Sequence, residues 1–564
     1  MACCLSRVVL AFRGLLCVLF LMSATARADD DPLQQHLRAR IEALELSRSV
    51  RVEGVELSAT KLIPSLYRAT QLKPVWSDPK KVDQLLHVIA AMELDGLDPK
   101  DYYLEKLQAL RTRVQESKDP LAALDLDLLL SDALARVIYH AHYGKVDPER
   151  LDDSWNLDNE YKGKRGPQAV LDAINGPSLY DAIESLKPQR PIYRKLRDAL
   201  AMYRAIQAAG GWGTIPAGKN IELGKSDPRV PAIRDRLALT GDLPKDADNK
   251  LEMYDDPLLL AVESFQKRHD LPIRSKIDGA LVRTMSLPPK VWIDMLRVNL
   301  ERARWILRVD DPTYVLVNIA AFHMYYVKDG KRVWDNDVQV GRTFSKTPLF
   351  REEIKYFVLN PLWTVPPGVL AETVLPNAKK SPRYIRERGL HVIDDTGHEV
   401  APESVNWHKF DAKNLPYSIT QDPGEGNALG VIKFMFPNQY HVYLHDTPNQ
   451  LGYEARVRTM SWGCIHVKDP LELAAHLAAD TQWSLQAVQK QVKTGRSATV
   501  FLTKPVPIYL LYWTAEVPDG GELRFHADVY NRDRRVLTTL NRPAVRRKEK
   551  RRVDVVADVI EQDP

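Results

Sequence analysis

The most informative stretch of this chain is Ser461-Trp462-Gly463-Cys464-Ile465-His466-Val467, which follows Tyr443-Leu444-His445-Asp446-Thr447. Cys464 comes nineteen positions after His445. A thiol becomes a strong nucleophile when a neighbouring imidazole accepts its proton. We therefore interpret Cys464 as a nucleophile and His445, a short hairpin away, as its proton acceptor and donor. We expect Asp446, adjacent on the strand, to point to the opposite face and make a structural bond.

The first 28 residues have the pattern of a cleaved export signal. Arg7 and Arg13 form a basic start, residues 14–22 are apolar but short for a membrane span, and Ala26-Arg27-Ala28 is a small-x-small cleavage site. An uncleaved anchor is the alternative. Export predicts a periplasmic location.

The other three cysteines, Cys3, Cys4 and Cys17, all lie in this predicted signal. The mature chain would then carry Cys464 alone, without an intramolecular disulfide partner. A lone cysteine can also be a small buried apolar residue, but the surrounding motif favours a nucleophile.

Composition limits the partners. The chain has 79 Lys and Arg against 74 Asp and Glu, and losing the three arginines of the signal leaves a net charge of about +2. This near balance argues against a general nucleic-acid binder. With 564 residues, 45% of them hydrophobic, the chain should form three or four domains.

Residues 29–210 are predicted to be helical, because stretches such as 81–89 and 121–143 repeat apolar positions at helical spacing. No acid, base and nucleophile cluster there, so we interpret this region as a scaffold. Gly210-Gly211-Trp212-Gly213 marks its end. Residues 220–290 resemble a small three-helix peptidoglycan-binding module, although their apolar spacing is also that of any amphipathic helix.

A mostly-β domain is predicted from about residue 312. Residues 314–319 and 322–327 are β-branched and aromatic, and Lys328-Asp329-Gly330-Lys331 forms a turn before a third strand at 333–340. This pattern predicts an antiparallel meander. Further strands are expected at 353–359, 431–436, 441–444 and 456–459.

A series of motifs then occurs in an order that few families share. They are Val317-Asn318-Ile319, Gly341 with Thr347-Pro348, Asn360-Pro361-Leu362-Trp363-Thr364-Val365-Pro366, residues 421–430, Lys433-Phe434-Met435-Phe436-Pro437-Asn438, and Tyr443 to Pro448. Together they resemble the large multidomain class of bacterial L,D-transpeptidases. That resemblance implies a β-sandwich catalytic domain at 312–505, with a capping segment inserted at about 366–422. It also implies a multidomain α+β chain, with a C-terminal strand region at 506–540 before a basic tail at 541–564.

The resemblance further implies a cysteine acyltransferase that acts on peptidoglycan stem peptides without a cofactor. Cys464 would attack the third residue of a donor tetrapeptide, release the terminal D-alanine and leave a thioester. An amine of an acceptor stem would resolve the thioester as a 3-3 cross-link. A Gram-negative envelope would fit this class.

Several residues around Cys464 are expected to form the site. Gly463 allows a tight turn, and its backbone amide, with that of Cys464, is a natural oxyanion donor. The family usually has histidine or serine in place of Trp462 and arginine in place of His466, so a permanent cation is lost here. The expected substrate-binding residues are Ser461, Trp462, His466, Tyr443 and Trp363, the last packing at the pocket edge.

These departures leave alternatives open: an L,D-carboxypeptidase or endopeptidase on the same scaffold, or a catalytically impaired wall-binding protein. A metal site built on His445, Cys464 and His466 is disfavoured, because no fourth ligand has a suitable spacing. The basic run at 546–552 is predicted to be a solvated tail. Its electrostatic attraction to membrane or wall polymers is the second interpretation.

Overall fold

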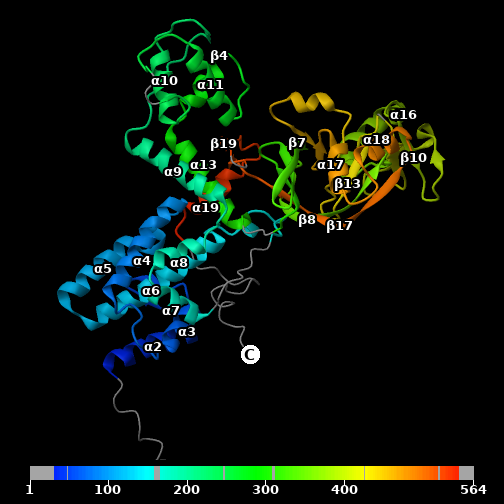
Figure 1. Cartoon of the computed structure of the whole chain (residues 1–564). Helices are drawn as coiled ribbons and strands as arrows, with labels where there is room; N and C mark the ends of the chain where they lie inside the picture. The colour runs from blue at the N-terminus through cyan, green and yellow to red at the C-terminus, as the bar shows by residue number, and fades with distance from the viewer. Residues whose placement is uncertain are drawn as a thin grey trace, which may run out of the picture.

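The computed structural model describes residues 31–47, 49–157, 166–244, 248–307, 311–424, 426–518 and 521–544. The predicted export signal and the basic run at 546–552 lie outside these residues. The chain forms a helical lobe, a smaller helical module and a β-rich lobe, which meet around α13 and the C-terminal segment (Figure 1). The expected multidomain α+β class is confirmed. No helix in the described part is long and apolar enough to cross a membrane.

The scaffold lobe is built around α6, whose side chains are largely buried. Asp127 of α6 accepts hydrogen bonds from the Tyr67 hydroxyl and from the backbone N–H of Val75 and Trp76, which ties the preceding loop to the central helix. Asp78 and Asp119 cap the helices that start at Pro79 and Pro120. The α-helices of this lobe are α2 (Pro32–Ser47), α3 (Leu62–Ala69), α4 (Pro79–Ala91), α5 (Leu104–Ser117), α6 (Pro120–Tyr143), α7 (Pro167–Asn175), α8 (Leu179–Ser185) and α9 (Pro191–Ala208).

The module has a core of its own. It contains α10 (Val230–Leu239), α11 (Asp256–Arg268) and α12 (Gly279–Met285), with β3 (Ile221–Glu222) paired to β4 (Lys276–Ile277). The helix α13 (Pro289–Ile306) then runs from the module into the centre of the molecule, where it packs on α9. The fully buried Arg304 of α13 pairs with Glu301 and donates to the Tyr193 hydroxyl, so α13 is locked to the scaffold.

The β-rich lobe is one nine-stranded sheet in the order β15-β7-β16-β14-β13-β8-β17-β5-β6. Because β6 also pairs with β7, the sheet closes on itself around an apolar core. The meander expected at 314–340 is present as its first three strands. The strands are β5 (Tyr314–Asn318), β6 (His323–Lys328), β7 (Lys331–Gly341), β8 (Phe350–Leu359), β13 (Ile432–Met435), β14 (Leu444–His445), β15 (Thr459–Ser461), β16 (Ile465–Val467) and β17 (Ala498–Leu511).

The hairpin expected between His445 and Cys464 is wrong. Strands β14 and β16 pair in parallel, with Leu444 opposite Ile465 and His445 opposite His466. A tight turn cannot join parallel neighbours, so the chain between them makes a crossover through the 3₁₀ turn η7 (Gln450–Glu454) and β15. After β16, α17 (Pro470–Leu477) and α18 (Leu485–Lys493) lead to β17.

A cap is inserted between the neighbouring strands β8 and β13. Its sheet is β11 (Glu399–Val400), β10 (Leu390–Ile393), β12 (Ser418–Gln421) and β9 (Trp363–Thr364) in spatial order, with the short helices α14 (Pro367–Val369), α15 (Leu375–Lys380) and α16 (Arg383–Glu387). The cap has a separate apolar core. At its base, the Asn427 side-chain amide donates to the carbonyls of Pro361, Gln421 and Asp422, which joins both ends of the insertion.

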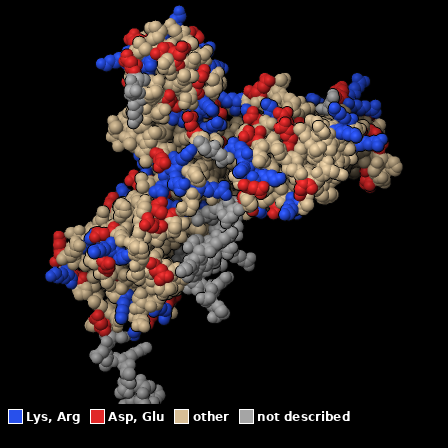
Figure 2. Space-filling view, viewed as in Figure 1, with Lys and Arg blue, Asp and Glu red and all other residues tan. Residues whose placement is uncertain are grey.

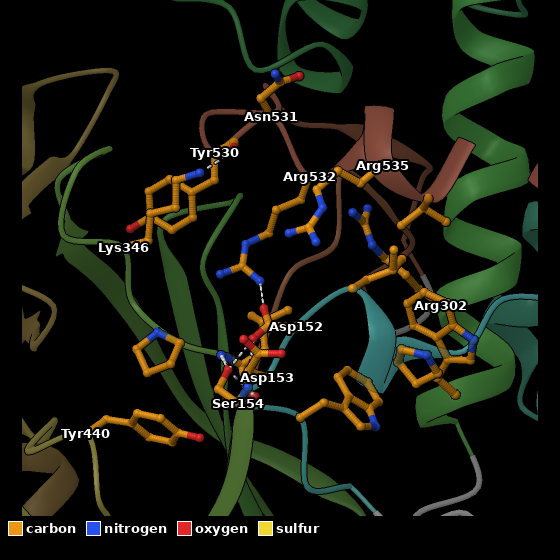
Figure 3. A pocket seen from close by; sticks show the side chains of 17 residues that line it. Asp152, Asp153, Ser154, Arg302, Lys346, Tyr440, Tyr530, Asn531, Arg532 and Arg535 are labelled. Carbon is orange, nitrogen blue, oxygen red and sulfur yellow. Dashed lines mark hydrogen bonds and ion pairs between the residues drawn. The ribbon is translucent and has the colours of Figure 1, made fainter. Parts of the chain in front are cut away.

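The C-terminal segment differs from the expected strand region. The boundary expected at 505 falls inside β17, and after β18 (Ala515–Glu516) and β19 (Arg524–Phe525) the segment ends in a helix, α19 (Asp533–Leu540). Figure 3 shows this segment between the lobes, where Arg532 pairs with Asp152 of the scaffold. The Lys346 ammonium of the catalytic lobe donates to the Tyr530 carbonyl at 2.9 Å.

We predict that Asn427→Ala loosens the base of the cap. Loss of three hydrogen bonds to largely buried carbonyls should cost about 1 to 3 kcal/mol of unfolding free energy, because those acceptors stay desolvated. Limited proteolysis should cut the variant near 422–430 faster than the parent. Asn406→Ala is the matched control, since Asn406 is an exposed cap residue whose side chain caps no helix. Equal cleavage in both variants would contradict the role of Asn427.

Candidate active site

Cys464 and His445 lie on one face of the sheet. Strand side chains alternate between faces, and the apolar Leu444 and Ile465 are fully buried in the core. The residues on either side of Leu444 and Ile465 therefore point to the outer face. Tyr443 lies beside Cys464 there, and His445 lies beside His466 two residues further along the strands. The bond from the Ile465 N–H to the Tyr443 carbonyl at 3.1 Å continues the parallel ladder to the level of the cysteine. The structure thus brings the predicted nucleophile and base onto adjacent strands.

The tautomer of His445 is fixed by its neighbour. Its Nδ1 lies 2.5 Å from the backbone carbonyl of Asp446, an acceptor only, so Nδ1 carries the proton and Nε2 carries a lone pair. Burial is the main cause that lowers the pKa of His445 to about 4; the hydrogen bond to Asp446 opposes this shift, and the Lys433 ammonium adds a smaller lowering. The imidazole is therefore a neutral base at pH 7. The Asp446 carboxylate makes structural bonds, as expected: it accepts from the Val431 N–H at 3.0 Å.

Cys464 is half-buried, and its thiol contacts the loop that precedes β14. The Sγ donates to the His441 carbonyl at 3.8 Å. Asn438 shapes this loop, because its side-chain amide donates to the Val442 carbonyl at 2.7 Å. Burial raises the pKa of the Cys464 thiol to about 11, against the opposing hydrogen bond from the Tyr443 backbone. The pair is therefore a neutral thiol and a neutral imidazole at pH 7.

The oxyanion role expected for the Gly463 amide stays a prediction; in this structure the amide has another partner. Its N–H donates to the Ser461 hydroxyl at 3.1 Å, and the same hydroxyl donates to the Cys464 carbonyl. The Cys464 N–H has no hydrogen-bond partner among the described residues, so it is the amide left to stabilise an oxyanion. Ser461 is 3% exposed, and its hydroxyl holds the turn. Ser461 therefore positions the turn, and its expected contact with substrate stays a prediction.

The turn at Gly463 requires glycine and is supported from behind. Gly463 has a φ of 116°, which favours glycine. The Thr347 hydroxyl donates to the Gly463 carbonyl at 2.8 Å and accepts from the Gly341 N–H at 2.9 Å. The Tyr530 hydroxyl donates to the Gly341 carbonyl at 2.5 Å. The C-terminal segment therefore reaches the nucleophile turn through two hydrogen-bonded layers.

A cavity of about 430 Å³ lies behind these layers, between the scaffold, α13, the catalytic lobe and the C-terminal segment (Figure 3). Lys and Arg side chains gather on the surface where the lobes meet (Figure 2). Two of the cations that line the cavity form ion pairs: Arg532 pairs with Asp152 and Arg302 pairs with Asp533. We interpret the cavity as a gap in an interface between lobes that ion pairs hold together.

Trp462 forms an aromatic surface beside the nucleophile. Its ring meets that of Phe344 edge-on at 5.6 Å between centroids, and the Arg342 guanidinium lies 5.2 Å from its centre. The Ser345 hydroxyl donates to the Trp462 carbonyl at 2.9 Å, which fixes the two loops together. Phe344 is 67% exposed, so this surface can contact a bound molecule.

His466 is not a cation in this site. Its Nδ1 lies 3.0 Å from the Gln339 Oε1, and the Gln339 Nε2 donates to the Asn449 carbonyl, which fixes the amide and makes His466 the donor. Burial lowers the pKa of His466 well below its usual value, and nearby His445 lowers it further. The positive charge that the family's arginine would supply is therefore absent at position 466.

Of the remaining expected substrate-binding residues, Tyr443 lies next to the proposed nucleophile and Trp363 lies in the cap. Tyr443 stands beside Cys464, and burial raises its pKa above the usual range. Trp363 lies in β9 of the cap and packs against the core of the cap. Gln339 and Lys433 were not among the site residues expected from the sequence. For Lys433 the sequence offered one clue, because this lysine starts the motif Lys433 to Asn438. For Gln339 it offered none, since only the pairing of β7 with β16 places this residue beside His466.

Comparisons with known proteins agree with this site. Residues 312–508 match the family model described as the L,D-transpeptidase catalytic domain, and residues 61–200 match the model of a scaffold domain. The chain carries an L,D-transpeptidase catalytic domain. The resemblance expected from the motifs is confirmed, and the predicted Cys464 and His445 both lie inside the matched transpeptidase domain.

One curated relative is a putative L,D-transpeptidase from Haemophilus influenzae, 24% identical over 494 residues, which are 87% of this chain and 82% of the relative. Solved structures with similarity include the catalytic domain of the E. faecium L,D-transpeptidase acylated by ertapenem, at 14% identity, 36% of this chain, 99% of that chain and a TM-score of 0.16. An L,D-transpeptidase from Stackebrandtia nassauensis matches at 14% identity, 52% of this chain, 94% of that chain and a TM-score of 0.20. At these TM-scores the alignments carry no further argument.

We predict that the resting thiol of the transpeptidase domain reacts slowly at neutral pH. Because burial raises the pKa of Cys464 to about 11, its alkylation by iodoacetamide should accelerate roughly tenfold per pH unit between pH 7 and 9, without a plateau. Mass spectrometry of the labelled peptide measures the rate. Cys464→Ala is the blank, and a small free thiol with a pKa of about 8.5 is the reference. A plateau near neutral pH would mean a preformed thiolate and would contradict this charge state.

Proposed function

We propose that the protein is an exported peptidoglycan L,D-transpeptidase that forms 3-3 cross-links through a thioester on Cys464. The observation that carries the proposal is the placement of Cys464 and His445 on one face of adjacent strands, with the His445 lone pair on Nε2. Membership of the catalytic domain in the L,D-transpeptidase family supports a peptidoglycan substrate. The export pattern of the first 28 residues supports a periplasmic location.

The first half-reaction makes the thioester. The Cys464 sulfur attacks the carbonyl carbon of the third residue of a donor tetrapeptide while His445 Nε2 takes the thiol proton. The oxyanion that forms accepts a hydrogen bond from the Cys464 N–H. When the intermediate collapses, the bond to the terminal D-alanine breaks, and the departing amine takes the proton from His445. The products are free D-alanine and an acyl-enzyme.

The second half-reaction transfers the acyl group. An amine of the third residue of an acceptor stem attacks the thioester carbonyl and gives a proton to His445. The carbon–sulfur bond then breaks, and the proton returns to the sulfur. The new amide is the 3-3 cross-link. Water in place of the amine would make the same chemistry an L,D-carboxypeptidase. The aromatic surface of Trp462 and Phe344 favours a bound acceptor, because it offers contact area beside the thioester.

We predict that residues 29–564 convert purified disaccharide tetrapeptide into a cross-linked dimer. The Cys464→Ala variant should form neither thioester nor dimer. His445→Gln should lose at least about 100-fold in rate, because it keeps a side chain of similar shape without the base. Mass spectrometry resolves dimer, tripeptide and acyl-enzyme, and thermal unfolding verifies that each variant is folded.

If the products are tripeptide and D-alanine without dimer, the protein is a carboxypeptidase and the proposed transpeptidase activity is wrong. Absence of any product that depends on Cys464 would contradict both enzymes and favour a wall-binding role.

A further inference from the structure

Four polar side chains form a row across the outer face of the catalytic sheet. Lys433 on β13 lies opposite His445 on β14, His445 opposite His466 on β16, and His466 opposite Gln339 on β7. Residues that are directly opposite in neighbouring strands share a face. The row therefore starts at Lys433 and passes directly beside the proposed base, one step along the sheet from Cys464.

Three members of the row have partners, and one has none. His445 bonds to the Asp446 carbonyl, and His466 bonds to Gln339, which also binds the Asn449 carbonyl. Among the residues that the structure describes, no hydrogen bond or ion pair engages the Lys433 ammonium. Lys433 is half-buried, and its neighbour on β8 in the same row is the apolar Val358.

An unpaired, partly desolvated ammonium is unfavourable, since buried lysines are normally paired. Burial lowers the pKa of Lys433, with no opposing contribution from an anion. The position is therefore suited to an anion that the resting protein does not provide. A negatively charged group of a bound molecule would supply the missing partner.

We propose that Lys433 binds a carboxylate of the donor stem peptide and so takes over the cationic role that position 466 lacks. The proposal rests on the transpeptidase function argued above. Lys433 lies two strand spacings of about 4.8 Å each from the strand of Cys464, and its side chain is long. A carboxylate close to the scissile carbonyl can therefore reach the ammonium while that carbonyl faces the thiol.

Arg342 is the other cation near Cys464, and it is less suited to this role. Its guanidinium already lies against two aromatic rings, 5.2 Å from the centre of Trp462 and 5.9 Å from that of Phe344. Lys433 in contrast stands next to the base, in the row that contains His445. A carboxylate held there would orient the scissile carbonyl along the line from Lys433 to Cys464.

Occupation of Lys433 would also change the base. The ammonium contributes to the low pKa of His445, and a bound carboxylate would cancel part of that effect and raise the pKa. The other titratable or charged groups around His445 are Tyr443 and Asp446, which flank it in sequence, Cys464 just before β16, and His466 on β16. Binding of the donor would thus make the imidazole a stronger base when the thiol needs one.

The test compares Lys433→Met and Lys433→Arg with the parent protein on three donors: the tetrapeptide, its C-terminal amide, and a tetrapeptide amidated on the third-residue side-chain carboxylate. Lys433→Met should raise KM for the free tetrapeptide about tenfold or more, and Lys433→Arg should restore most of this loss. One of the two amidated donors lacks the carboxylate that Lys433 binds, and the parent should show a raised KM for that donor. On the same donor, Lys433→Met and the parent should have similar KM values. A purely structural role would impair all three donors equally.

Lys355→Met is the matched control, because Lys355 is an exposed lysine of β8 in the same sheet. It should behave as the parent. The acid limb of kcat/KM should move to higher pH in Lys433→Met and stay in place in Lys433→Arg. If Lys433→Met keeps the parental KM on the free tetrapeptide while Cys464-dependent cross-linking persists, the carboxylate site is wrong and the proposed function stands. If the parent forms no Cys464-dependent product, the proposed function itself fails.

Discussion

The catalytic lobe depends on the parallel pairing of β14 and β16. The register that sets Leu444 against Ile465 buries both side chains in the core. A shift of one residue would expose these apolar groups and turn the cysteine and histidine inwards, which makes the register strongly determined. The hydrophobic core thus decides that Cys464 and His445 share an outer face. Everything polar in the site is built on that apolar constraint.

The resting site keeps its reactive groups neutral, and burial is the main cause. The pKa of the thiol is raised to about 11 and that of the imidazole is lowered to about 4. Both shifts disfavour transfer of the thiol proton to the imidazole, although the imidazole is unprotonated and the thiol holds the proton to be transferred. An uncharged nucleophile is also less exposed to oxidation, because susceptibility follows thiolate character. A carboxylate bound at Lys433, as proposed, would raise the pKa of His445 and so favour transfer of the thiol proton.

Much of this organisation follows from the sequence. The helical repeats of the scaffold, the meander before Gly341 and the joint occurrence of Cys464 and His445 were all recognisable, because local periodicity and motif spacing carry them. The parallel crossover was not recognisable, because a spacing of nineteen positions between His445 and Cys464 is compatible with a hairpin or with a crossover. The use of the Gly463 amide by Ser461 was equally hidden, because it depends on one side-chain rotamer. The charge states of His445 and His466 depend on burial beneath segments distant in sequence, such as Gln339 on β7 and Asn449 before η7.

The replacement of the family's arginine by His466 is best understood from the whole row. A guanidinium at position 466 would add a permanent charge beside His445. Here a neutral imidazole, held by Gln339, occupies that place, and the ammonium of Lys433 stands on the opposite side of the base. In the proposed site one cation therefore stands beside His445, on the side of this histidine that faces away from His466. Because the outer-face positions of the sheet alternate with its core positions, this exchange needs no change in the packing of Phe434, Leu444 or Ile465.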